Sequence, residues 1–234
     1  MMKHTIALLA LLLTTILPLP AQPRRLTDWA KLNTYARDNN TVKTWPRARR
    51  RAVFIGNSIT QRWQEAHPAF FSDNGFVCRG ISGQATTPML VRFRHDVVSI
   101  RPKVVVIHAG INDIAENDGP YRETVTFSNI QSMVEIACAN HIKVVLTSVL
   151  PATVFRKAPQ VTDRAERIAG LNRLIQGYAE RNKIPYVDYY HYLGCESGSD
   201  IIFRPELTTD GVHPNADGYT RMESILMKVL RKML

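Results

Sequence analysis

Cysteine is scarce in this chain: its 234 residues contain only three, Cys78, Cys138 and Cys195. An odd number of thiols cannot all pair within one chain, and no two of them have the short spacing of a zinc site. Cys78 and Cys138 have apolar neighbours in the sequence, so we expect both to be core thiols, although one disulfide is left open. Histidines and carboxylates do not cluster at metal-ligand spacing either, which predicts chemistry without a metal ion or other cofactor.

Long hydrophobic runs are also missing, with one exception near the N-terminus. Residues 5–17 are predominantly apolar, follow the charged Lys3, and end at a breaker with small residues over 18–22. This pattern is typical of a secretory signal peptide, which we place at residues 1–22, and the run is too short to cross a bilayer comfortably. An uncleaved anchor is the alternative, whereas a lipid anchor would need a cysteine directly after the run, where there is none. We therefore expect a secreted or periplasmic protein without stable membrane insertion after signal removal.

Acidic residues are in the minority, with 20 aspartates and glutamates against 30 lysines and arginines, a formal net charge of +10. A basic chain can associate with anionic polysaccharide, lipid head groups or nucleic acid. The densest basic cluster, residues 47–51, is short, has no interleaved aromatics and directly precedes a predicted strand. We interpret it as a solvated flank and predict no nucleic-acid partner.

Internal repeats and low-complexity tracts are absent from residues 23–234, which are long enough for one hydrophobic core, so we predict a single domain there. Five short apolar runs have the composition of buried strands. They cover residues 52–55, 76–78, 104–107, 143–146 and 185–187.

Segments with helical periodicity separate these runs. We predict helices over about 121–137, from Asp163 as N-cap through Tyr178, and from Asn215 to the C-terminus, after a lead-in helix that begins near Asp28 and ends at Asn39-Asn40. Buried strands that alternate with helices predict a mostly parallel, five-stranded sheet covered on both faces, an α/β fold.

Four short motifs follow the predicted strands or precede the last helix. They are Gly56-Asn57-Ser58, Ile81-Ser82-Gly83, Gly110-Ile111-Asn112-Asp113 and Asp210-Gly211-Val212-His213. Reactive groups of such a sheet collect at the carboxyl ends of its strands, so we expect these four segments to meet at one edge.

The first and last motifs contain the residue types of a hydrolytic triad. A serine hydroxyl is a poor nucleophile until a neutral imidazole, held by a carboxylate, takes its proton. We assign Ser58 as nucleophile, His213 as general base and Asp210 as its orienting carboxylate, which predicts that activity falls in mild acid as the imidazole is protonated. A helix N-cap is the structural alternative for Ser58.

The middle motifs offer donors for the oxyanion that forms when a carbonyl is attacked. We expect an oxyanion hole made by the N–H groups of Ser58 and Gly83 and by the Asn112 amide. Gly83 could instead serve a turn and Asn112 a cap. Asp113 is given no catalytic role, and His108 is expected to line the pocket or to be a satisfied core histidine.

With these residues in place, the chain resembles the SGNH, or GDSL, hydrolase family over about residues 26–230, and within it the branch of the platelet-activating-factor acetylhydrolase catalytic subunits. The resemblance implies a three-layer α/β/α flavodoxin-like fold. It matches the family nucleophile to Ser58, the oxyanion donors to Gly83 and Asn112, and the last block to Asp210 and His213. The first block departs from the usual Gly-Asp-Ser in having Asn57.

The preferred function is a secreted serine esterase that removes a short acyl group, with acetyl expected first, from a carbohydrate or another small ester. The Gly-x-Ser-x-Gly signature of a different esterase fold is absent because Thr60 replaces its second glycine. Two alternatives stay open: a lysophospholipase or thioesterase of the same mechanism, and a non-catalytic glycan-binding module. The sequence gives no oligomeric state.

Overall fold

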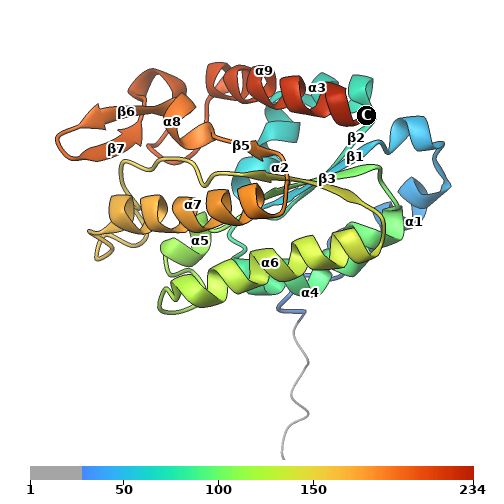
Figure 1. Cartoon of the computed structure of the whole chain (residues 1–234), viewed down its shortest axis with the longest axis horizontal. Helices are drawn as coiled ribbons and strands as arrows, with labels where there is room; N and C mark the ends of the chain where they lie inside the picture. The colour runs from blue at the N-terminus through green and yellow to red at the C-terminus, as the bar shows by residue number, and fades with distance from the viewer. Residues whose placement is uncertain (1–27) are drawn as a thin grey trace, which may run out of the picture.

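A computed structural model describes residues 28–234, and its centre is a five-stranded parallel sheet (Figure 1). The strands are β1 (Ala52–Gly56), β2 (Phe76–Gly80), β3 (Val104–His108), β4 (Lys143–Thr147) and β5 (Tyr186–Val187). Their order is β2-β1-β3-β4-β5, the arrangement of flavodoxin-like folds. The predicted sheet is therefore confirmed, including the position of each strand.

Helices cover both faces of the sheet, which gives three layers. Figure 1 shows α4, α6 and α7 below the sheet and α2, α3 and α9 above it. The helices are α1 (Ala36–Thr44), α2 (Ser58–Ala66), α3 (Pro68–Asn74), α4 (Thr86–Asp96), α5 (Ile111–Ile114), α6 (Glu123–Ala139), α7 (Arg164–Arg181), α8 (Tyr189–Leu193) and α9 (Ala216–Met233), with 3-10 turns η1 (Arg47–Arg49), η2 (Val98–Ile100) and η3 (Pro205–Leu207).

The strands form where they do because both faces of the sheet are covered. Every residue of β1, β2 and β3 is buried, as expected for apolar runs in a parallel sheet. The first residues of neighbouring strands are in register, Ala52 beside Val104 and Val104 beside Lys143. The turns that enter these strands therefore lie side by side at one edge of the sheet. The turns that leave them lie side by side at the opposite edge.

The lead-in segment differs from the prediction, because α1 begins at Ala36 rather than near Asp28. The Asp28 carboxylate accepts hydrogen bonds from the N–H groups of Leu32 and Asn33, and Lys31 has a left-handed backbone (φ 55°), so this stretch forms turns. Asn39 does not end the helix. It is buried inside α1, where its amide nitrogen donates to Asp96 Oδ1 at 2.7 Å.

One element was not predicted, one smaller expectation is corrected, and one is confirmed in position only. A two-stranded hairpin of β6 (Gly194–Ser197) and β7 (Asp200–Phe203) was not predicted. Cys138 is exposed rather than in the core, because the helical period of α6 points Met133, Val134 and Ala137 inward instead. Asp163 is the N-cap residue of α7, but its carboxylate pairs with Arg167 Nε at 2.8 Å and makes no capping bond.

The predicted signal peptide, residues 1–22, lies outside the described residues. Within 28–234, every helix is too short or too polar to traverse a lipid bilayer.

His108, the last residue of β3, gives the fold a predicted sensitivity to acid. Its Nδ1 lies 2.7 Å from Thr147 Oγ1, and burial lowers the pKa of the ring from 6.5 to about 4. Between pH 6.5 and about pH 4, this histidine is protonated in the unfolded chain but neutral in the folded chain. The free energy of unfolding therefore falls as the pH falls. This one group is expected to cost about 2.5 kcal/mol of unfolding free energy on going from pH 7 to pH 4.5.

Urea unfolding at pH 7 and pH 4.5 measures this loss. In His108→Asn the acid-induced loss is expected to be smaller than in the wild type by that amount, whereas His95→Asn, which changes an exposed histidine on α4, keeps the wild-type loss. An equal loss in all three proteins would show that His108 does not titrate in this range.

Candidate active site

The turn from β1 into α2 presents Ser58. Gly56 has no room for a side chain, since a Cβ there would lie 2.1 Å from Thr60 Oγ1 and 2.9 Å from His108 O. Asn57 is the N-cap of α2, and its Oδ1 accepts from Ile59 N at 3.1 Å. The N-cap alternative for Ser58 is therefore wrong. Ser58 is the first helical residue, and its hydroxyl oxygen lies 2.9 Å from His213 Nε2.

Asp210 and His213 share one tight turn before α9. Asp210 Oδ2 lies 2.8 Å from His213 Nδ1, while Oδ1 accepts from the N–H groups of Val212 (3.0 Å) and His213 (2.9 Å). Gly211 provides the left-handed step of the turn (φ 84°). Burial acts to raise the pKa of Asp210, but the hydrogen bonds from the His213 N–H and ring and from Val212 outweigh it, so the pKa lies below its usual value. The carboxylate is thus held ionised beside the ring.

Contacts between α2 and α9 hold the serine and the histidine in register. The Tyr219 hydroxyl donates to Ile59 O at 2.9 Å, and the Tyr219 ring stacks on Trp63 with centroids 5.7 Å apart. Trp63 Nε1 donates to Glu223 Oε1 at 2.9 Å. The helix that begins at Ser58 is therefore fixed to the helix that follows His213.

Gly83 and Asn112 lie beside Ser58 in the same cavity. Gly83 has φ 80°, a conformation that favours glycine, although a Cβ would meet no atom there within 4 Å. Asn112 is inside α5 rather than at its cap, and its Nδ2 donates to Gln84 O at 3.0 Å, which leaves a second amide N–H. Within residues 28–234 the backbone N–H groups of Ser58 and Gly83 have no hydrogen-bond partner. Three free donors therefore belong to residues that line one cavity.

Asp113 is tied into the structure around the site. Its carboxylate accepts from the N–H and hydroxyl of Thr86 and from the hydroxyl of Thr126. Burial raises its pKa. It joins α5 to α4 and α6. His108 does not line the cavity, so of its two expected positions the structure shows the core one.

The cavity that contains these groups measures about 310 Å³. One wall, which the sequence reasoning missed, comes from the loop between β4 and α7. It is formed by Val154, Phe155, Arg156, Lys157 and Ala158. The N–H of Thr153 donates to Gly211 O at 2.8 Å, so this loop is attached to the turn that carries Asp210. Its length, 16 residues from 148 to 163, is a signal that could have pointed to a functional loop.

Arg92 is a second residue that was missed. It is fully buried on α4, with Nη2 donating to Gly56 O, Nε to Gln84 Oε1 and Nη1 to Asp96 Oδ2, at 2.6 to 2.9 Å. One guanidinium therefore connects the end of β1, just before Ser58, to the loop that carries Gly83. We regard Arg92 as a positioning residue for both.

The arrangement as a whole has the chemistry of acyl transfer. A hydroxyl, an imidazole and a carboxylate form a hydrogen-bonded chain, and N–H donors line the same cavity. Within the described part of the chain, three or more His, Cys, Asp or Glu side chains are nowhere grouped as a cation site would require.

Comparisons with known proteins agree with this geometry. Residues 54–221 match the GDSL-like lipase/acylhydrolase family. A Bacteroides fragilis NCTC 9343 protein designated an acylhydrolase has 48% sequence identity and a TM-score of 0.84, covering 87% of this chain and 97% of its own. A GDSL-like lipase from Bacteroides thetaiotaomicron VPI-5482 has 45% identity and a TM-score of 0.84, covering 88% of this chain and 99% of its own.

More distant structures share the fold alone. An acetylxylan esterase from Geobacillus stearothermophilus has 18% identity and a TM-score of 0.57, covering 76% of this chain and 92% of its own. Comparison with curated protein sequences gives no match. The family match spans well over half of the chain, and the resemblance inferred from the motifs is confirmed: this protein belongs to the GDSL-like lipase/acylhydrolase family.

Proposed function

We propose that the protein is an exported serine esterase that hydrolyses short-chain acyl esters, acetyl first, on a carbohydrate or similar small acceptor. Ser58 Oγ attacks the ester carbonyl while His213 Nε2 takes its proton. The N–H groups of Ser58 and Gly83 and the free amide N–H of Asn112 stabilise the oxyanion. His213 then returns the proton to the departing alcohol, and water hydrolyses the acyl-serine by the same steps in reverse.

The observation that carries this proposal is the hydrogen-bonded chain from serine to carboxylate. Ser58 Oγ lies 2.9 Å from His213 Nε2, and His213 Nδ1 lies 2.8 Å from Asp210 Oδ2. Both distances are within the range that nucleophile and base need for proton transfer. A non-catalytic binding module would not need this alignment.

The size of the cavity supports a short acyl group. At about 310 Å³ it is at the small end of ligand sites. Its lining is predominantly apolar, with Val154, Phe155 and Val212 in the wall, and Arg62, Arg156 and Lys157 add cationic groups. A polar acceptor such as a sugar suits them, and export rests on the sequence of residues 1–22.

A series of p-nitrophenyl esters from acetyl to decanoyl tests the proposed specificity. We expect kcat/KM to be highest for acetyl and to fall steadily with chain length, because a cavity of this volume has little room for a long acyl chain. A rate that rises toward decanoyl would instead support the lysophospholipase or thioesterase alternative. No hydrolysis of any ester at neutral or alkaline pH would support the glycan-binding module.

Replacing Asn112 with alanine tests the oxyanion hole. Loss of one donor is expected to lower kcat by about 10²- to 10³-fold with little change in KM, since the donor acts mainly on the transition state. Asn182→Ala is the matched control. Asn182 also donates an amide N–H to a backbone carbonyl, that of Tyr178, but on the exposed end of α7. Equal kcat in both variants would remove Asn112 from the mechanism.

A further inference from the structure

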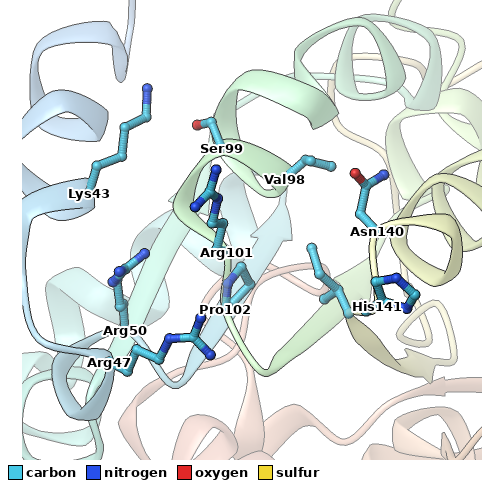
Figure 2. A pocket seen from close by; sticks show the side chains of 10 residues that line it. Lys43, Arg47, Arg50, Val98, Ser99, Arg101, Pro102, Asn140 and His141 are labelled. Atoms are coloured by element: carbon cyan, nitrogen blue, oxygen red, sulfur yellow. The ribbon is translucent and has the colours of Figure 1, made fainter.

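A second cavity lies at the other end of the sheet, over the amino ends of β1, β3 and β4 (Figure 2). It measures about 650 Å³, well within the range of small-molecule sites. Its walls are the turns that enter these three neighbouring strands, together with the end of α1. Because the strands start in register, the turns converge on one place.

Of the residues that the structure describes, four cationic side chains line this cavity and no carboxylate does. They are Lys43, Arg47, Arg50 and Arg101. Figure 2 shows Lys43, Arg47 and Arg50 along one side of the cavity, Arg101 in the middle, and Asn140 and His141 along the other side. Within residues 28–234 none of the four forms an ion pair. Like charges in one cavity repel each other, and an anionic ligand would relieve that repulsion.

The basic cluster at residues 47–51 is thus divided by the fold. Arg49 stacks its guanidinium over the Trp45 ring at 4.7 Å and is outside the cavity. Arg50 is held at the cavity wall, where Nε donates to Trp45 O at 3.0 Å and Nη1 donates to Ile100 O. A guanidinium has five N–H donors, so three stay free on a side chain that is already fixed. The interpretation of the whole cluster as a solvated flank is therefore wrong for Arg50.

Two cavity residues occupy backbone positions that favour glycine. Arg101 has φ 55° and His141 has φ 58°, each in the turn between a helix and a strand. Glycine would adopt this conformation at lower cost. Cations near helix carboxyl ends are favourable, and this accounts for Lys43 in the last turn of α1. Arg47 and Arg50 lie in and directly after η1, and Arg101 directly follows η2, but a turn of three residues sums too few peptide dipoles to account for them.

We propose that this cavity binds a multiply charged oxyanion, the phosphate or sulfate group of a small molecule or of a polyanionic glycan. Guanidinium groups pair with such groups through two parallel hydrogen bonds, and several cations suit more than one negative charge. The cavity is at the opposite edge of the sheet from Ser58, so the ligand and an acyl substrate can be bound together. If the bound group belongs to a glycan, this site would attach the protein to the glycan while the cavity that contains Ser58 stays open to solvent.

Isothermal titration calorimetry in low-salt buffer, with inorganic phosphate and separately with a heparin-derived hexasaccharide, tests this site. Arg101→Gly and Arg47→Ala are each expected to weaken binding by at least about tenfold. Arg101→Gly removes the charge while relaxing the backbone, so the thermal midpoint should equal or exceed that of the wild type. Tighter binding of the hexasaccharide than of phosphate identifies a glycan-borne group, and the reverse identifies a small ligand.

Two matched variants control for charge and backbone. Lys183→Gly changes a cation in the same left-handed conformation (φ 55°) before β5, and Arg49→Ala changes the arginine on Trp45. Both are expected to bind like the wild type, and all four variants should hydrolyse an acetyl ester at the wild-type rate. Failure of both probes to bind, or equal weakening by the control variants, would overturn the proposal. Calorimetry decides this whether or not the protein is an esterase.

Discussion

Replacing Ser58 with alanine is expected to lower kcat for p-nitrophenyl acetate by about 10⁴- to 10⁶-fold, the size of effect seen when a serine nucleophile is removed. The reason is that the Ser58 oxygen forms the acyl bond in the proposed mechanism, and among the described residues no other hydroxyl is hydrogen-bonded to the His213 ring. Within residues 28–234 the Ser58 hydroxyl has one hydrogen-bond partner, the His213 ring. The substitution therefore removes the proposed nucleophile and its hydrogen bond to His213, and no other hydrogen bond of the Ser58 side chain.

The fold gives this experiment a clear control. Ser58 is the first residue of α2, and the capping bond comes from Asn57, so alanine fits the helix. Ser82→Ala changes another serine of the same cavity, whose hydroxyl bonds to Gln61, and should retain near-wild-type kcat. The thermal midpoints of both variants should match that of the wild type. Unchanged turnover in Ser58→Ala would mean that another residue is the nucleophile, or that the ester is cleaved without one.

Asp210→Asn is expected to lower kcat by about 10⁴-fold, the effect of the corresponding change in a well-studied triad. Asparagine can keep an oxygen in place of Oδ1, which accepts from the N–H groups of Val212 and His213, so the turn should persist. Its NH₂ would then face His213 Nδ1, which becomes the acceptor. The ring proton then lies on Nε2. A protonated Nε2 faces the Ser58 hydroxyl but cannot accept its proton.

The chain contains an unusually close control for this variant. Asp188 also bonds the backbone N–H of a histidine three residues later, His191, through Oδ1 (3.1 Å) and the ring Nδ1 through Oδ2 (2.7 Å), but on the surface. Asp188→Asn repeats the local change away from the cavity and should leave kcat within about twofold of the wild type. Equal losses in Asp188→Asn and Asp210→Asn would point to folding rather than to the tautomer of His213.

The sheet and the location of the site could be predicted because both depend on local patterns. Each strand is a short apolar run, since both faces of a parallel sheet are buried. The rule that loops at the carboxyl ends of strands meet at one edge of the sheet then predicts that Ser58 lies near Gly83 and Asn112. The turn with Asp210 and His213 is local as well, because three residues separate the two side chains.

Other features depend on contacts between distant residues, which a single sequence does not reveal. Arg92 was not singled out from the sequence, and it is buried because Gly56, Gln84 and Asp96 supply its acceptors. Asp28 reads as a helix start, but it closes turns with Leu32 and Asn33. The cavity wall over residues 154–158 has no periodicity, and only its attachment at Thr153 to Gly211 brings it to the site.

The central claim is that His213 activates Ser58, and covalent labelling with a serine-directed fluorophosphonate tests it most directly. Peptide mapping after labelling is predicted to find the phosphonyl group on Ser58, with labelling abolished in Ser58→Ala and slowed at least about 10²-fold in His213→Ala. A label on another residue, or a His213→Ala variant that is labelled at the wild-type rate, would contradict the account.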